Sequence, residues 1–166
     1  MLLELPTADE IDELAADTPD LVVRRFELDL LEMKFDMDYT PCKGEAVVVT
    51  KRREGVFLLR KGAASVWTLP SGRIAMDEAP EEAGARVVSE SCGIDAEGMR
   101  LRALYDVTRH YGNISVKRLL VVYECEAGSA EPRTPEAPGT KCALHTDDLD
   151  KLVLEDIDAQ AIADCM

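Results

Sequence analysis

Metal-ligand and disulfide patterns are missing from this sequence. Its two histidines, His110 and His145, lie far apart, and none of its five cysteines occurs in a C-x-x-C spacing. An odd number of unpatterned cysteines supports neither a disulfide framework nor a zinc site. We therefore expect reduced thiols, as in a cytoplasmic protein, and assign no metal to the histidines.

Long apolar runs are also absent. The longest β-like run, LLVVY at 119–123, is far shorter than the roughly 20 apolar residues that cross a bilayer as a helix. The N-terminus, MLLELPTADEIDEL, lacks the basic region and apolar core of a signal peptide. The sequence predicts a cytoplasmic protein with no membrane partner.

The chain has no excess of basic charge. Its formal net charge is −14, and residues 1–40 alone carry 3 basic and 12 acidic side chains. Residues 41–140 carry 14 of each, so the centre is neutral and the flanks are acidic. An acidic surface repels the phosphate backbone of a nucleic acid duplex, which we exclude as the main partner. A small anionic ligand remains compatible with the neutral centre.

Residues 1–40 form an acidic N-terminal extension, and residues 41–166 form the main domain. Thr7-Ala-Asp-Glu10 has the form of a capping box, which predicts a short helix over 8–17. After Pro19, the segment LVVRRFELDLLEMKF alternates apolar and charged residues, which indicates a half-buried strand or two. This segment is a candidate dimer arm, so a homodimer is one assembly that the sequence suggests.

The main domain alternates strands with few helices. A hairpin is predicted over 45–52 and 55–60, a short strand over 66–70, a helix over 80–92, an antiparallel pair over 99–110 and 115–126, a loop over 127–140 and a helical ending. Pro80 near the start of the central helix and Gly93 just after it are typical helix boundaries. The order of elements predicts a mixed α/β (α+β) sandwich without the regular βαβ alternation of a doubly wound fold.

The central helix and the turn before it carry a spaced set of acids, glycines and one arginine. Over WTLPSGRIAMDEAPEEAGARVVSESCGI, the set consists of Gly72, Glu78, Arg86, Glu90, Gly93 and Ile94. Glu82, Arg86 and Glu90 fall on one side of the helix, where a ladder of surface ion pairs is the simplest explanation. The surrounding pattern, however, extends over 28 residues, which makes chance agreement improbable.

This set resembles the motif of the Nudix hydrolases, G-x5-E-x7-R-E-U-x-E-E-x-G-U, where U is a bulky aliphatic residue. The resemblance implies a Nudix α/β/α sandwich with a mixed sheet, and Mg²⁺- or Mn²⁺-dependent attack of water on a diphosphate linkage. It also implies that Arg86 pairs with Glu78 to order the loop, that Glu90 binds the metal ion, and that the carbonyl group of Ser71 assists.

Two glutamates of that motif are replaced here, by Val87 and Ser91. With Glu90 they lie at i, i+3 and i+4, so we expect them to share the face that presents three glutamates in active relatives. A single carboxylate can still hold Mg²⁺ together with substrate phosphates and water. Substitute acids are Asp77, Asp106, Glu131 and Glu136, although a solvated surface acid is the simpler explanation for each.

Ligand contacts outside the motif are predicted from residue type. Arg73 directly follows Gly72 and is the first candidate for a phosphate contact, and Trp67 is a candidate for stacking on a base. Further candidates on similar terms are Tyr105, Tyr111, Tyr123, Arg109, Lys117 and Arg118. For the aromatic residues, packing within the core or across strands is the competing explanation.

Three functional hypotheses follow. The first is a Nudix-type hydrolase that binds a small nucleoside diphosphate derivative and cleaves its pyrophosphate linkage slowly, with Glu90, Glu78 and Arg86 as its functional residues. The second is a non-hydrolytic nucleotide sensor whose metal site has decayed, as Val87 and Ser91 suggest. The third is a structural dimerisation module built on residues 1–40.

Overall fold

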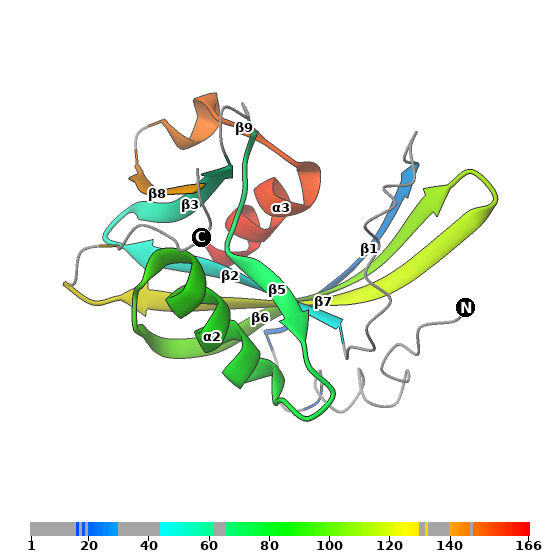
Figure 1. Ribbon diagram of the computed structural model, residues 1–166, viewed down its shortest axis with the longest axis horizontal. Coiled ribbons are helices and arrows are strands. Elements are labelled where there is room, and N and C mark those ends of the chain that lie inside the picture. The colour runs from blue at the N-terminus through cyan, green and yellow to red at the C-terminus, as the bar shows by residue number, and fades with distance from the viewer. Residues whose placement is uncertain are drawn as a thin grey trace.

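The computed structural model describes residues 16, 18, 20–29, 44–61, 66–129, 132, 140–146 and 148–166 (Figure 1). In chain order its elements are β1 (Val22–Asp29), β2 (Gly44–Arg52), β3 (Gly55–Lys61), β4 (Val66–Trp67), β5 (Ser71–Ile74), α2 (Pro80–Cys92), β6 (Ala96–Tyr111), β7 (Ile114–Ala127), β8 (Thr140–His145), the 3-10 turn η1 (Leu149–Lys151), β9 (Val153–Leu154) and α3 (Asp156–Cys165). The main sheet has the strand order β1-β6-β7-β2-β3-β8, and β5 pairs with β2. Strands β4 and β9 form a second, two-stranded sheet.

Helices α2 and α3 cover opposite faces of the main sheet (Figure 1). One core cluster contains Val47 of β2 together with Ile157 and Ile162 of α3. The other contains Val48 of β2 together with Val88 of α2. Since neighbouring residues of a strand point to opposite faces, the two clusters lie on the two sides of the sheet. The predicted α/β/α sandwich with a mixed sheet is therefore confirmed.

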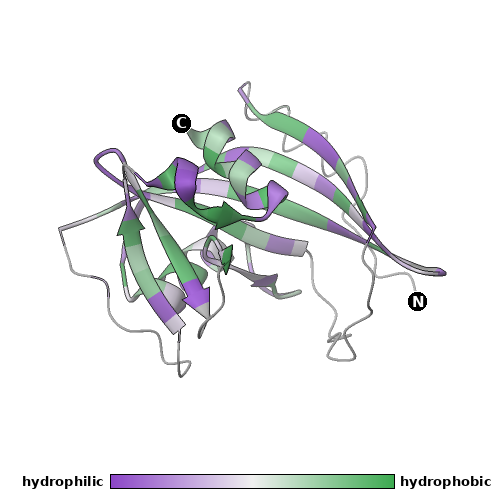
Figure 2. Cartoon of the chain, turned by 90° about the horizontal axis from the view of Figure 1, so that it is seen from above, coloured by the Kyte–Doolittle hydropathy of each residue, from purple (hydrophilic) through white to green (hydrophobic). Residues whose placement is uncertain are grey.

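The pairing of the strands is mixed. The hairpin β2–β3 and the long pair β6–β7 are antiparallel, whereas β1 runs parallel to β6 and β2 parallel to β7. The strands are largely hydrophobic where the helices cover them, and hydrophilic residues gather at the outer ends (Figure 2). No helix among the described residues is long and apolar enough to cross a membrane.

Most of the elements predicted from the sequence are present. The helix α2 has the predicted limits, and Gly93 ends it in the left-handed conformation with φ 63°. The segment TKCALH, for which the sequence predicted no strand, forms the edge strand β8 against β3. The helix expected over 8–17 and the loop expected over 127–140 lie outside the described residues, apart from residues 16, 127–129, 132 and 140.

Strand β1 belongs to the N-terminal extension but is part of the main sheet. It pairs with β6 from Val22↔Ala103 to Asp29↔His110. The guanidinium group of Arg24 donates to both carboxylate oxygens of Asp164 in α3, at 2.8 and 2.7 Å. Tyr105 of β6 also donates its hydroxyl to Asp164, whose side chain is only 5% exposed. The pair with Arg24 holds the pKa of Asp164 at about 2.

A second acid of α3 connects that helix to the strand segment before the motif. Asp158 accepts a hydrogen bond from the backbone of Leu69, and burial, with a smaller contribution from Glu155, raises its pKa to about 7. A carboxyl group whose pKa is higher in the folded than in the unfolded chain stabilises the fold while it is protonated. Its contribution is complete below pH 4 and is lost as the pH rises through about 7.

We therefore expect Asp158→Asn to raise the free energy of unfolding at pH 8 by a few kcal/mol at most, and to change it little at pH 4. Urea unfolding of both proteins at the two pH values measures the difference. Asp156→Asn, an exposed acid of the same helix, is the control and should leave the pH dependence as it is in the wild type. Equal stabilisation at both pH values would show that removing the charge of Asp158 is not the cause.

Candidate active site

The turn that leads into the motif is fixed to the middle of the main sheet. The carbonyl group of Pro70 accepts a hydrogen bond from the backbone N–H of Val48 at 3.0 Å. The next residues form β5, which pairs antiparallel with β2 from Ser71↔Val47 to Ile74↔Gly44. The backbone around Ser71 is thus held in place by the sheet, and the Ser71 side chain is exposed.

The loop between β5 and α2 is closed by Glu78. Its backbone N–H donates to the carbonyl group of Ala75 at 3.1 Å, and its Oε1 accepts from the backbone N–H of Ala75 at 3.3 Å. Pro80 then occupies the first helical position, and two acids, Glu81 and Glu82, lie in the first turn, where the helix dipole favours negative charge. The loop therefore has one fixed entry into α2.

Arg86 joins the separate parts of the motif. Its Nε and Nη2 donate to the two carboxylate oxygens of Glu78 at 2.9 and 3.1 Å. The Nη2 group also donates to the carbonyl group of Arg73 at 2.7 Å, and Nη1 donates to Glu90 at 3.2 Å. One planar guanidinium group thus connects β5, the loop and two turns of α2.

The pairing of Glu78 with Arg86 keeps both side chains charged. The hydrogen bonds from Arg86 hold the pKa of Glu78 below its usual range, and Glu78 in turn raises the pKa of Arg86. A carboxylate that is paired in this way is a poor proton acceptor, because protonation breaks the pair. Glu78 is therefore suited to organising the loop, in agreement with the role that the resemblance implies.

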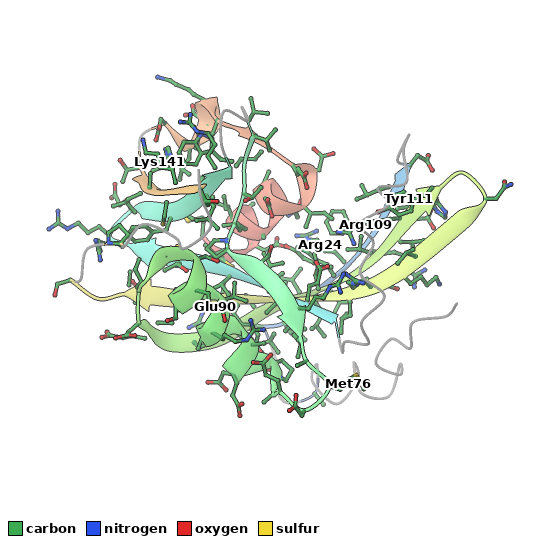
Figure 3. All side chains as sticks on the ribbon, viewed as in Figure 1. Arg24, Met76, Glu90, Arg109, Tyr111 and Lys141 are labelled. Carbon is green, nitrogen blue, oxygen red and sulfur yellow. The ribbon has the colours of Figure 1, made fainter. Side chains whose placement is uncertain are left out.

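Glu90 differs from Glu78 in its exposure. Its side chain is 65% exposed, and among the described residues its only ion pair is with Arg86. Glu90 lies on the outer side of α2 (Figure 3). One carboxylate oxygen of Glu90 is thus hydrogen-bonded to Arg86, and the side chain is accessible to an incoming ligand.

Val87, Glu90 and Ser91 lie on one side of α2, as their spacing predicts, but they differ in exposure. Val87 is only 2% exposed, whereas Ser91 is half-buried. A Cβ atom added to Gly72 would lie 2.8 Å from Cγ2 of Val87, so the valine fills the space directly beneath β5. The side chain at position 87 is covered by β5, which helix spacing alone does not reveal.

A metal ion would find a sparse set of donors here. Within the part of the chain that the structure describes, no group of three or more His, Cys, Asp or Glu side chains could hold a metal ion. Glu90 supplies one carboxylate, Ser71 can supply a backbone carbonyl group, and Val87 supplies none. Such a set suits Mg²⁺ only in the mode where phosphates and water provide the remaining ligands.

The predicted ligand contacts are not all brought to this site. Trp67 is 8% exposed, with the guanidinium group of Arg60 5.0 Å from its ring centroid and the ring of His145 4.3 Å away, edge to face. It is therefore a core residue and offers no open surface for a base. Arg73, by contrast, lies in β5 within the motif and takes part in it through its carbonyl group.

The remaining candidates are spread over the sheet. Tyr105 and Tyr123 are buried. Arg109 and Tyr111 lie on the projecting β6–β7 hairpin, away from Glu90 (Figure 3). Asp77 and Lys117 are exposed. Arg118 forms an ion pair with Glu45 at 2.6 Å, and Asp106 forms one with Arg25 at 3.7 Å. Glu131 and Glu136 lie outside the described residues.

Two contributors to the site were missed by the reasoning from sequence. The carbonyl group of Arg73 and the backbone of Ala75 both bind the charged side chains of the motif. Every residue carries these backbone groups, so no side-chain pattern could have identified them. Only the fold places them beside Arg86 and Glu78.

The comparisons agree with this arrangement. A family model described as NUDIX domain matches residues 40–165. A MutT NUDIX hydrolase from Burkholderia pseudomallei is similar in structure, with 23% sequence identity, a TM-score of 0.59, and coverage of 74% of this chain and 96% of that chain. An ADP-ribose pyrophosphatase from Streptococcus suis has 19% identity and a TM-score of 0.56, covering 73% of this chain and 87% of the other. A mutator MutT protein from Bacillus halodurans has 16% identity and a TM-score of 0.61, covering 74% and 79%. No curated protein matched.

Proposed function

This chain belongs to the Nudix family, and on that premise we propose that it hydrolyses the diphosphate linkage of a small nucleotide derivative. The observation that carries the proposal is the arrangement around Arg86, which fixes the loop and leaves Glu90 open to solvent. The acidic flanks of the chain favour a small ligand over a nucleic acid duplex. The N-terminal extension keeps a homodimer as the proposed assembly.

The residues of the motif have two proposed roles, positioning the loop and binding a metal ion. Glu78 and Arg86 hold the backbone of β5 and the loop in one geometry, which positions the diphosphate against α2. Glu90 and the carbonyl group of Ser71 would hold Mg²⁺ or Mn²⁺ brought in with the phosphates. When bound, such an ion neutralises charge on the phosphate oxygens and makes water a better nucleophile.

The proposed reaction is slow. Within α2 the family pattern has glutamates at positions 87, 90 and 91. In this chain only Glu90 is retained. The loss of a general base lowers a rate by about 10²–10⁴-fold. Hydrolysis without a dedicated base would therefore depend on the positioning of the diphosphate and on a weakly bound metal ion.

The direct test is turnover with Glu90→Gln. Purified wild type is incubated with nucleoside triphosphates, ADP-ribose, sugar nucleotides and dinucleoside polyphosphates in Mg²⁺ or Mn²⁺, and the products are quantified. We expect Glu90→Gln to reduce turnover by at least about 100-fold, because it removes the one open carboxylate. Glu82→Gln is the matched control, since it neutralises another exposed acid of α2, and its turnover should stay within about twofold of the wild type.

A second function is favoured by Val87. Because this residue fills the space beneath β5 with methyl groups, the chain is also suited to binding a nucleotide without cleaving it. In that case thermal stabilisation by one ligand of the panel would persist in EDTA, and neither the wild type nor Glu90→Gln would form products. Metal-dependent turnover that is lost in Glu90→Gln would reject this alternative.

A further inference from the structure

Three basic side chains meet at one acid near the C-terminal end of α3. Lys51 of β2, Arg100 of β6 and Arg102 of β6 lie 2.8, 3.2 and 3.9 Å from the carboxylate oxygens of Glu124 in β7. Three positive charges against one negative charge leave an excess of two among these four side chains. This local excess of positive charge occurs in a chain whose formal net charge is −14.

Two of the three basic side chains also hold α3 against the sheet. The Nζ group of Lys51 donates to the carbonyl group of Cys165 at 2.8 Å, and Nη2 of Arg102 donates to that of Asp164 at 3.3 Å. Positive charge is favourable at the C-terminal end of a helix, so these contacts have a structural explanation. The cluster therefore lies on the α3 side of the sheet, whereas Arg86 and Glu90 belong to α2.

Arg100 has no such structural role within the described residues. Its side chain is 63% exposed, and its ion pair is with Glu124, a carboxylate that Lys51 approaches more closely. An exposed ion pair of this kind contributes little to stability. The guanidinium group of Arg100 can therefore bind a ligand without loosening α3.

An open pocket of about 200 Å³ adjoins the two arginines. Strand β1 pairs with β6 only from Ala103 onward, so no described strand lies beside β6 at residues 100–102. The turn before β1, in which the N–H of Leu21 donates to the carbonyl group of Thr18 at 3.0 Å, lies across this gap. The residues that line the pocket are Thr18, Asp20, Arg100, Leu101 and Arg102.

We propose that this pocket binds a phosphoryl group through Arg100 and Arg102. Guanidinium groups match the geometry of phosphate oxygens and donate charge-assisted hydrogen bonds to them. The pocket is smaller than the roughly 300–1,000 Å³ of sites for drug-sized ligands, so it suits inorganic phosphate or the phosphoryl end of a larger molecule. This second site is independent of the hydrolysis proposed at α2.

Asp20 distinguishes a binding site from a cluster that only holds α3. It also lines the pocket, and its negative charge opposes an anion there. Asp20 is exposed, so water and salt weaken this repulsion without removing it. If the pocket binds a phosphoryl group, removing the charge of Asp20 must strengthen binding, and removing the charge of Arg100 must weaken it.

The test is a titration of the purified full chain with potassium phosphate, followed by ¹H–¹⁵N correlation spectra. EDTA is present, because phosphate binding at α2 is proposed to need a metal ion, and potassium chloride keeps the ionic strength constant. We expect saturable shifts of the backbone amide signals of Thr18, Leu101 and Arg102. Ribose 5-phosphate is the second probe: tighter binding than phosphate identifies the ligand as a larger phosphorylated molecule, and weaker binding identifies it as free phosphate.

Three variants complete the test. Arg100→Gln should weaken phosphate binding at least about fivefold, because it removes a charged donor. Asp20→Asn should strengthen binding by about two- to fivefold. Arg25→Gln, which removes a 79% exposed cation of β1, is the matched control and should bind as the wild type does. The same affinity in the wild type and Arg100→Gln, weaker binding by Asp20→Asn, or shifts that potassium chloride alone reproduces would overturn the proposal.

Discussion

Arg86→Ala is expected to lower turnover, or ligand affinity if the protein does not hydrolyse its ligand, by at least about 100-fold. The variant removes the donors to Glu78, to the carbonyl group of Arg73 and to Glu90 together. Glu78 would then lose both of its hydrogen bonds from Arg86, and the loop would lose its fixed geometry. A positional error of about 1 Å is enough for an effect of this size.

The stability of the variant is predicted to change much less. Arg86 is 38% exposed, so water compensates for part of the lost pairing, and we expect a decrease of about 1–2 kcal/mol in the free energy of unfolding. Arg86→Lys should rescue little, because an ammonium group cannot donate to Glu78 and to the Arg73 carbonyl group in the same planar arrangement. Lys151→Ala removes an exposed cation elsewhere and is the control. Full activity of Arg86→Lys would show that only the positive charge matters.

The double variant Val87→Glu/Ser91→Glu is expected to lose several kcal/mol of stability without metal and to recover it in Mg²⁺. Without metal, the carboxylate at position 87 would be placed beneath β5, where Val87 is 2% exposed, and burial of an unpaired charge is strongly destabilising. With Mg²⁺, the three carboxylates would be neutralised together, and an ion that binds only the folded state stabilises it by mass action. Thermal unfolding in EDTA and in millimolar Mg²⁺ measures both effects.

Val88→Glu is the matched control for this experiment. Val88 is the neighbouring residue, is fully buried, and belongs to the core between α2 and the sheet. Its replacement should destabilise the protein equally in EDTA and in Mg²⁺, because the core offers no route to a metal ion. If Mg²⁺ rescued both variants alike, or neither, position 87 would not be a metal-facing position in this chain.

The sequence was most informative where local rules act alone. Pro80 and Gly93 define the limits of α2, because proline suits the first helical turn and glycine tolerates the left-handed conformation that ends it. The spacing of Glu82, Arg86 and Glu90 likewise predicted ion pairs along α2, of which Arg86–Glu90 is present, while the pair of Arg86 with Glu78 was implied by the family resemblance. Both predictions depend on residues that are near each other in the chain.

Features that depend on distant segments could not be predicted in this way. Strand β8 is short and is defined by its pairing with β3 rather than by a strong pattern of its own. The burial of Val87 depends on Gly72 lying above it, and the role of the Arg73 carbonyl group depends on where the backbone of β5 runs. Helix periodicity tells which residues share a side of α2 but not what covers that side.

The link between β1 and α3 has a consequence for the way the chain folds. Arg24 and Asp164 are 140 positions apart in the sequence. During synthesis, β1 leaves the ribosome before α3 has been made. The strands between them can therefore assemble before Arg24 has its partner Asp164. Closing such a long loop is slow, because the chain entropy is lost before the contacts that compensate for it have formed. The ion pair between Arg24 and Asp164 is therefore a late event in folding, formed after the strands between them have assembled.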